Sequence, residues 1–398
     1  MPTTVPPALV NATGRILDPN LGGTPWSAAA RAAATAAAGY ADLGRDPLGT
    51  TGAQAAALLG AGDAMVASSL PGAIALVLAA LPWQPVIARP DMISVRGARL
   101  GDLATAVGRP LVEVGAADVV EPDDYRRVLT PSTAVIVVHP VAGAARPTWS
   151  EVVAIADASE SAHVHLVLSG ALHESALGAR TMAASTAAVA EREDADDLRS
   201  EPSAAEVLDA GANLVVVATD GLAGGPALAL LAGSPSVLDV LRAHPLAAAL
   251  RADRTLVAAL AATLDAHDAA SPPTSLPVHA MLTTSTASLE ARARSLAAAV
   301  GHGAEAIACR SATALAPRDV IHLDSWGLLV PSGDPDALAD RLAGGVPPIV
   351  GVLDEAGVVL DLRTVAPSHD PLVARAVQSS LTVPTLGATG SAFQPPLG

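Results

Sequence analysis

Residues 213–228 read Asn-Leu-Val-Val-Val-Ala-Thr-Asp-Gly-Leu-Ala-Gly-Gly-Pro-Ala-Leu, and the prediction of the fold starts from them. The β-branched apolar run 214–217 predicts a buried strand, because it has no polar side to turn toward water. A second apolar run at 227–231 predicts another strand shortly after it. Two strands joined by a glycine-rich corner are typical of the sheet edge where many α/β enzymes place a reactive group.

The corner itself, residues 219–221, carries a threonine, an aspartate and a glycine. Gly224 and Gly225 follow within a few residues and give the chain the freedom to turn back toward the sheet. The corner lacks the reactive group, such as an amine, that this arrangement usually displays.

Short apolar runs alternate with helical segments along the first half of the chain. Strands separated in this way predict an α/β fold, with a mostly parallel sheet whose two faces are covered by helices. The strands are predicted at residues 64–67, 85–88, 110–114, 134–139 and 163–168, and the helices at 73–81, 100–107, 122–129 and 149–159.

The chain is predicted to hold two domains with flanking segments. A helix at 26–41, capped by Thr24, opens the large domain, and one long helix at 246–266 leaves it. Residues 348–353 and 358–362 predict a β-hairpin in a smaller domain. The predicted parts are an N-terminal arm at 1–25, a large α/β domain at 26–245, a linking helix at 246–270, a small α+β C-terminal domain at 271–381 and a loose tail at 382–398.

Composition argues against several classes of function. The formal net charge of −16 repels phosphate backbones, and few aromatic residues are present to stack on bases, so nucleic-acid binding is not expected. No apolar run reaches the roughly 20 residues of a membrane span, and the N-terminus does not resemble a signal peptide. Cys309 is the single cysteine, which suits the cytoplasm. All 23 basic residues are arginine, so no side-chain amine is present to form a Schiff base.

Several segments carry a further pattern, in order, from about residue 8 to about residue 377. They include Asn-Ala-Thr-Gly-Arg-Ile-Leu at 11–17, Pro-Asn-Leu-Gly-Gly-Thr-Pro-Trp-Ser at 19–27, Val-Glu-Val-Gly at 112–115, Asp-Gly-Leu-Ala-Gly-Gly-Pro at 220–226, His-Pro-Leu at 244–246 and Leu-Asp-Leu-Arg-Thr-Val at 360–365. Together they resemble the bacterial selenocysteine synthase family, the L-seryl-tRNA(Sec) selenium transferases. The family's version of the corner reads Asp-Lys-Leu-Leu-Gly-Gly-Pro.

The resemblance implies the fold of pyridoxal-phosphate (PLP) enzymes of the aspartate aminotransferase type, fold type I. It implies a large domain with a seven-stranded, mostly parallel sheet, a small C-terminal domain and an active site at a dimer interface. It also implies a homo-oligomer built from dimers, of which a ring is one form. In the family, the lysine that follows the aspartate of the corner holds PLP as an internal aldimine.

The positions that hold the cofactor in the family have changed in this chain. Gly221 occupies the position of the Schiff-base lysine, and Val167 occupies that of the aspartate that pairs with the pyridine nitrogen. Because a valine cannot stabilise a pyridinium, we expect the electron-sink chemistry to fail. Small residues remain where the family binds phosphate. This vestigial cradle consists of Ser68, Ser69, Gly72, Gly224 and Gly225.

These departures predict no catalytic residues and no cofactor, with PLP absent or bound only weakly and without a covalent bond. His139 matches a family histidine that follows a buried strand, so His139 and Asp220 are the residual candidates for acid–base chemistry. The family's N-terminal tRNA-gripping domain has no counterpart before the first matching segment, so tRNA is not an expected partner.

The leading hypothesis is a pseudoenzyme that acts as an oligomeric scaffold or as a regulator of an unidentified protein partner. The alternative is a family-type transferase or lyase that acts on a small substrate without a covalent lysine, using His139, Asp220 and His165. A third reading is a small-anion binder that uses Ser68 and Ser69. Selenium transfer to seryl-tRNA is not expected, and neither is a metal site.

Overall fold

The computed structural model describes residues 8–18, 21, 23–40, 47–139, 145–172, 202–268, 275–316 and 319–382. The chain divides into two compact units. The smaller unit comprises Met1–Arg15, Ser285–Ala312 and His322–Gly398, and the larger unit comprises Ile16–Thr284 and Thr313–Ile321. The tail predicted beyond residue 382 and the first seven residues of the predicted arm lie outside the described residues. The domain boundaries inferred from the sequence stay a prediction.

The larger unit is built on a seven-stranded sheet in which every strand except β11 runs in the same direction. All five residues of β10 are buried, since both faces of the sheet are covered. The strand order is β3 (Asp63–Ala67), β11 (Ala229–Gly233), β10 (Leu214–Ala218), β9 (Ala162–Val167), β8 (Thr133–His139), β4 (Gln84–Ala88) and β7 (Val112–Val114). The predicted mostly parallel sheet is therefore present.

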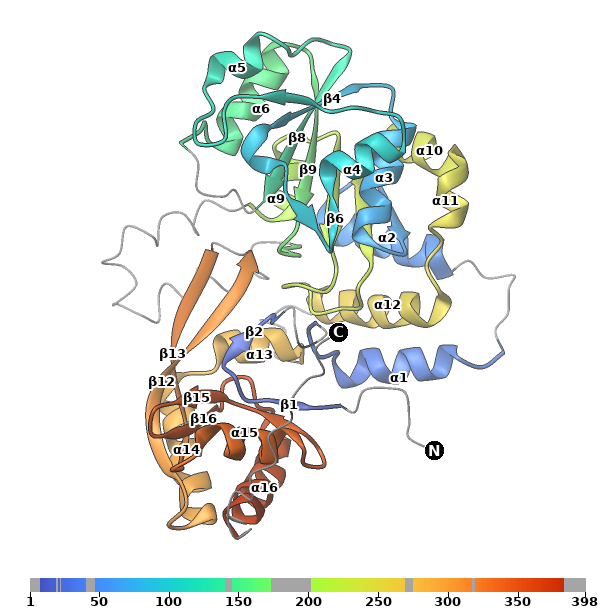
Figure 1. Cartoon of the computed structure of the whole chain (residues 1–398). Helices are drawn as coiled ribbons and strands as arrows, with labels where there is room; N and C mark the ends of the chain where they lie inside the picture. The colour runs from blue at the N-terminus through green and yellow to red at the C-terminus, as the bar shows by residue number, and fades with distance from the viewer. Residues whose placement is uncertain are drawn as a thin grey trace, which may run out of the picture. The chain divides into compact units, whose positions relative to one another are not determined.

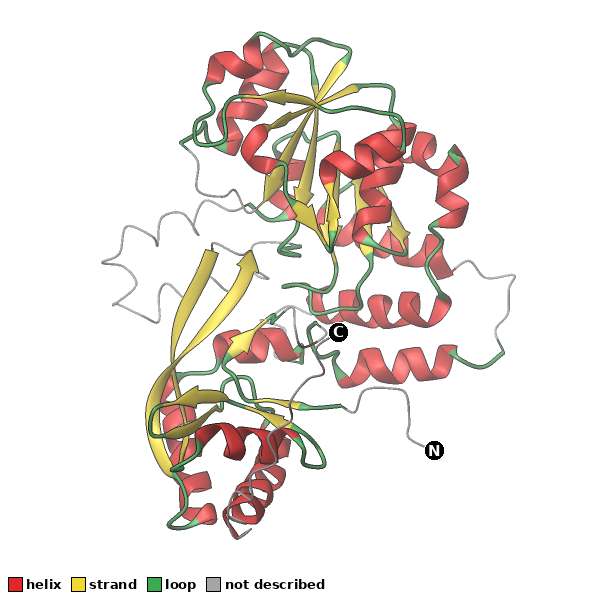
Figure 2. Ribbon diagram, viewed as in Figure 1, coloured by secondary structure: helices red, strands yellow, loops and turns green. Residues whose placement is uncertain are grey.

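Helices cover both faces of this sheet (Figure 2). On one face, Ile136 and Val164 pack in a core with α3 (Leu70–Ala80), α4 (Leu100–Ala106) and α10 (Pro235–Ala243). On the other face, the strand residues that point away from this core pack against α5 (Pro122–Arg126) and α6 (Trp149–Ala158) (Figure 1). The other α-helices among the described residues of the larger unit are α1 (Ala28–Ala37), α2 (Pro47–Leu59), α9 (Ala204–Asp209), α11 (Pro245–Ala249), α12 (Arg254–Asp268) and α13 (Pro277–Thr283).

Two predictions about helices were wrong. Helix α1 begins after Ser27, whose hydroxyl accepts from the Ala30 N–H, because Thr24 instead donates to the carbonyl of Asp220. The long helix predicted at 246–266 is divided into α11 and α12. The chain breaks between them because the Leu250 carbonyl accepts a hydrogen bond from Ser68, on the segment that follows β3.

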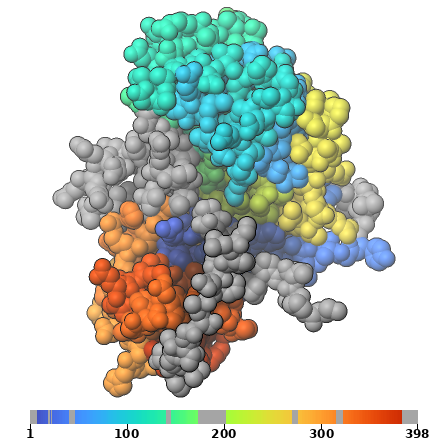
Figure 3. Space-filling model, viewed as in Figure 1, coloured from blue at the N-terminus to red at the C-terminus, as the bar shows by residue number. Residues whose placement is uncertain are grey.

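The smaller unit combines helices with antiparallel strands. The hairpin predicted from residues 348–353 and 358–362 is present as β15 and β16, but the long hairpin formed by β12 and β13 was not predicted. The segment coloured orange to red in Figure 3 contributes most of this unit. Its elements are β1 (Val10–Asn11), α14 (Thr286–Val300), β12 (Glu305–Ala316), β13 (Asp319–Pro331), α15 (Pro335–Ala343), β14 (Ile349–Val350), β15 (Val352–Asp354), β16 (Gly357–Asp361) and α16 (Asp370–Thr382), with β2 (Arg15–Ile16) joining their sheet.

No helix in the described ranges combines the length and the apolar character that crossing a membrane requires.

Candidate functional site

The corner that follows β10 is tied together by its own hydrogen bonds. The Thr219 hydroxyl donates to the Pro226 carbonyl and accepts from the Leu228 N–H at 3.1 Å. The N–H groups of Gly224 and Gly225 donate to the carbonyls of Gly221 (3.0 Å) and Thr219 (2.8 Å). Because these amides already have partners, the two glycines form a tight turn and do not offer free donors to a phosphate.

Gly221 lies where no side chain fits. A Cβ atom on this residue would lie 2.1 Å from the carbonyl oxygen of Ser169, on the segment that follows β9. The same oxygen accepts a hydrogen bond of 2.7 Å from the Leu222 N–H. The direction in which a side chain would leave Gly221 is therefore filled by hydrogen-bonded backbone.

Asp220 is 8% exposed, and its carboxylate pairs with Arg96, whose Nη2 lies 2.5 Å from Oδ2. Burial raises the pKa of Asp220 above its usual range, and the Arg96 guanidinium opposes that shift. Arg96 lies in the turn between the two-residue strands β5 (Ser94–Val95) and β6 (Ala98–Arg99), with a φ of 51° that non-glycine residues rarely adopt. The pair with Arg96 could not be found from the sequence, because more than a hundred positions separate the two residues.

Three histidines lie on one face of the sheet. His139 ends β8 and stands in register with Val167, which ends β9 and is completely buried. His139 Nε2 lies 2.9 Å from Nδ1 of His165, and His165 Nε2 lies 3.0 Å from Nδ1 of His163. Burial and the nearby Arg146 guanidinium lower the pKa of His139 to about 3, so this imidazole is neutral at physiological pH. His163 and His165 are two residues apart on one strand, a spacing that puts both on the same face, whereas nothing in the sequence shows that they connect to His139.

The predicted phosphate cradle is largely occupied by the protein. Ser69 caps α3, and its hydroxyl accepts from the Gly72 N–H at 3.2 Å. Pro71 contributes no N–H, and the Ser68 N–H donates to the Leu250 carbonyl at 2.8 Å. A Cβ on Gly72 would lie 2.4 Å from Cδ2 of Leu250. Few backbone donors at this helix start remain for an anion.

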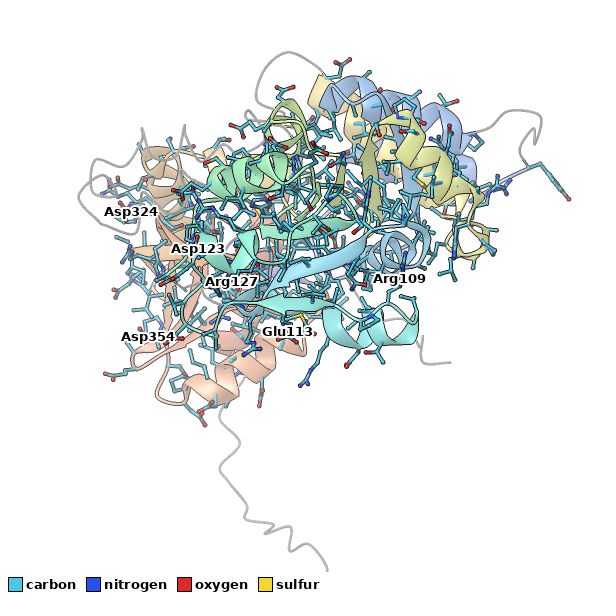
Figure 4. The ribbon with its side chains drawn as sticks, turned by 90° about the horizontal axis from the view of Figure 1, so that it is seen from above. Arg109, Glu113, Asp123, Arg127, Asp324 and Asp354 are labelled. Atoms are coloured by element: carbon cyan, nitrogen blue, oxygen red, sulfur yellow. The ribbon has the colours of Figure 1, made fainter. Side chains whose placement is uncertain are left out.

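Several arginines on the surface are paired with carboxylates. Arg126 and Arg127 lie beside Asp123 (2.7 Å) and Asp124 (3.1 Å), respectively. Figure 4 labels Asp123 and Arg127 at helix α5. It also labels Glu113 on the edge strand β7, where Arg89 pairs with Glu113 at 3.0 Å. Arg126 and Arg127, which are consecutive in the sequence, therefore do not form a free basic patch. Within the described ranges, no group of three or more histidine, cysteine, aspartate or glutamate residues could hold a metal ion.

The family profile of L-seryl-tRNA selenium transferase matches residues 9–366. The chain belongs to this family. Among curated relatives, the L-seryl-tRNA(Sec) selenium transferase of Hyphomonas neptunium is 30% identical over 395 residues, which cover 93% of this chain and 81% of the relative. The enzyme of the same name from Moorella thermoacetica is 28% identical over 405 residues, which cover 94% and 81%.

Among solved structures, a D-glucosaminate-6-phosphate ammonia-lyase superposes with a TM-score of 0.64 at 18% identity, covering 94% of this chain and 95% of that one. A serine palmitoyltransferase with a PLP internal aldimine matches at a TM-score of 0.47 and 12% identity, covering 94% and 86%. The predicted fold class, a fold-type-I PLP transferase fold, is confirmed.

The prediction that this selenium transferase relative has no cofactor is wrong. Its family and the fold it shares with PLP enzymes point to PLP as the cofactor. The residues that the resemblance places at the two cofactor positions do not fit the family's way of holding that group. Gly221 offers no amine, with the Ser169 carbonyl in its side-chain direction, and Val167 offers no charge to a pyridine nitrogen. The roles assigned to single residues from the sequence stay predictions.

Proposed function

We propose that this chain is a pseudoenzyme of the L-seryl-tRNA selenium transferase family, which forms no Schiff base between PLP and a side chain of its own. In this proposal the protein acts as an oligomeric scaffold or as a regulator of another protein. PLP remains the cofactor to which the family points, and the proposal concerns the missing covalent chemistry.

The contact between Gly221 and Ser169 is the observation that supports the proposal most directly. If the cleft were open and only the lysine were missing, a single substitution at position 221 would restore the amine. Here the Ser169 carbonyl lies 2.1 Å from the position of the missing Cβ and is held there by the Leu222 N–H. Real Cβ atoms do not approach a backbone oxygen so closely, so a lysine needs movement of the backbone as well as a new side chain.

The first experiment measures whether added PLP becomes reactive on the protein. The purified chain is incubated with PLP and serine, and the products of amino-acid elimination are compared with those formed by PLP alone. The proposal predicts no difference. Turnover above PLP alone would contradict it.

A matched pair of lysine variants tests the blocked direction. Gly39→Lys places an amine where no atom lies within 4 Å of the added Cβ, whereas Gly221→Lys places it against Ser169. After incubation with PLP and borohydride reduction, peptide mapping should find a pyridoxyl adduct on the variant residue in Gly39→Lys and not in Gly221→Lys. An adduct at residue 221 in a protein with wild-type stability would show that the cleft is open.

The proposed scaffold role needs an assembly. Light scattering should give a mass that is an even multiple of the chain, and a monomer at micromolar concentration would contradict the role. Mixing with a catalytically complete family member should give mixed oligomers or a changed rate of that enzyme. We also propose that tRNA does not bind, which a gel-shift titration at moderate salt tests directly.

A second candidate function is a lyase or transferase that uses acid–base groups without a covalent lysine. The observation that favours it is a pair of groups with shifted pKa near the carboxyl ends of β10 and β8, the two strands that flank β9. Burial raises the pKa of Asp220 and lowers the pKa of His139. The serine assay distinguishes the two candidates, since this one predicts turnover that Asp220→Asn abolishes.

A further inference from the structure

A continuous row of imidazoles runs through the larger unit between β8, β9 and α6. His163, His165 and His139 are at most 2% exposed, and the two ring-to-ring hydrogen bonds measure 3.0 and 2.9 Å. Trp149 packs edge-on against His139 and His165, with ring centroids 6.3 and 6.2 Å away. The apolar surroundings strengthen hydrogen bonds along such a row and leave no water between the rings.

The two ends of the row differ. At one end, Nε2 of His163 lies 3.7 Å from Oδ1 of Asp157, a carboxylate on α6 whose side chain is 63% exposed. At the other end, Nδ1 of His139 is enclosed and has no hydrogen-bond partner within the described residues. His139 is the last residue of β8, at the carboxyl edge of the sheet, and the corner at Gly221 follows β10 at the same edge, with β9 between the two strands. The row therefore connects the protein surface with the carboxyl edge of the sheet.

A neutral imidazole carries one N–H, so the row has two consistent arrangements. In the first, every ring is protonated on Nε2: His139 donates to His165, and His165 donates to His163. In the second, every ring is protonated on Nδ1, and both hydrogen bonds point the other way. Changing from one arrangement to the other shifts one proton per ring and leaves the total charge unchanged.

The surroundings favour the first arrangement. It directs the N–H of His163 toward the carboxylate of Asp157 and leaves only a lone pair at Nδ1 of His139. The second would direct a lone pair at the carboxylate and bury an N–H without an acceptor, which is the more costly defect. The Asp157 charge and the Gly211 carbonyl both act to raise the pKa of His163, although burial outweighs them.

No ring in the row is suited to hold a positive charge. Burial lowers the pKa of all three histidines, and Arg146 lowers that of His139 further. Arg146 is itself paired with Asp91 at 2.6 Å, so this guanidinium stays beside the row. A proton that enters at one end must therefore displace another at the far end.

We propose that His139, His165 and His163 form a proton relay between the carboxyl edge of the sheet and Asp157. Water carries a proton to the enclosed Nδ1 of His139. The Nε2 proton of His139 passes to Nδ1 of His165, the Nε2 proton of His165 passes to Nδ1 of His163, and the Nε2 proton of His163 leaves to the Asp157 carboxylate or to water. The reverse sequence resets the row. This inference does not depend on the pseudoenzyme proposal.

The test is the protonation state of each ring nitrogen in the full-length protein. Solid-state NMR of protein labelled with ¹⁵N in its histidine rings distinguishes Nε2–H from Nδ1–H, and single histidine variants assign the signals. In the wild type, Nε2–H should be the major form of His139, His165 and His163, with a minor Nδ1–H form. Nδ1–H as the major form of any of the three would overturn the relay as described.

The second arm measures coupling along the row. Asp157→Asn removes an exposed charge and should raise the ratio of Nδ1–H to Nε2–H at His139 about two- to five-fold, the range expected for an exposed charge pair. His302→Gln, at an exposed histidine outside the row, should leave the ratio unchanged. A purely structural role predicts no response at His139, two rings away, so an unchanged ratio in Asp157→Asn overturns the proposal.

Discussion

Gly221→Ala is the smallest change that tests whether the corner is closed. The added methyl group would lie 2.1 Å from the Ser169 carbonyl oxygen and 2.8 Å from its carbonyl carbon. Ordinary van der Waals contact requires roughly 3.5 Å, so the two backbone segments have to separate by more than 1 Å. Neither atom belongs to a flexible side chain that could turn aside.

The cost has two parts. Inserting a carbon into a packed interior costs about 1–3 kcal/mol. Separation also stretches the hydrogen bond from the Leu222 N–H, and a buried donor left without its acceptor costs about 1–3 kcal/mol. We expect a loss of about 3 kcal/mol in the free energy of unfolding, which for a unit of this size lowers the melting temperature by roughly 6 °C or more.

Thermal unfolding followed by circular dichroism provides the measurement, with Gly39→Ala as the matched control. No atom lies within 4 Å of a Cβ added at Gly39, so that variant should stay within about 0.5 kcal/mol of the wild type. If Gly221→Ala melts within 1 °C or so of Gly39→Ala, the corner is open and the main argument for the pseudoenzyme fails.

Three further variants test the electrostatics of the larger unit by unfolding at several pH values. Burial raises the pKa of Asp220 above 3.8, so the folded state keeps this proton longer than the unfolded chain, and wild-type stability falls as pH rises above about 4. The free energy of unfolding of Asp220→Asn should therefore rise relative to that of the wild type between pH 4 and pH 7. A relative decrease over this range would refute the raised pKa. The pKa of His139 is lowered from 6.5 to about 3, so the neutral imidazole stabilises the folded state less and less as pH falls below 6.5. In His139→Leu, the free energy of unfolding should therefore fall less steeply with decreasing pH than in the wild type, by about 1.4 kcal/mol per pH unit. An equally steep fall of the free energy of unfolding in the variant would mean that His139 is not buried in its neutral form. Arg146→Met should cost about 3–5 kcal/mol because it leaves the Asp91 carboxylate buried, and adding Asp91→Leu should recover most of that loss.

Local sequence was sufficient to predict the parts of the fold that follow from the pattern of apolar residues along the chain. The apolar run Leu214–Ala218 is buried on both faces, and such runs, separated by helical segments, predicted the parallel sheet. The absence of lysine is a property of the sequence alone, and so is the glycine at position 221. The order of the family segments indicated the family, which the profile match then showed.

Tertiary structure decided everything that depends on residues distant in the chain. The break at Leu250 and the hydroxyl bond from Thr24 arise from contacts across the fold, so helix propensity could not predict them. For the same reason, the hydrogen-bonded row from His139 to His163 could not be predicted, because contacts between strands depend on the register of the strands and not on spacing along the chain. The sequence therefore determined that the corner has no amine. Only the folded chain, with the Ser169 carbonyl against Gly221, decided that the corner has no room for one.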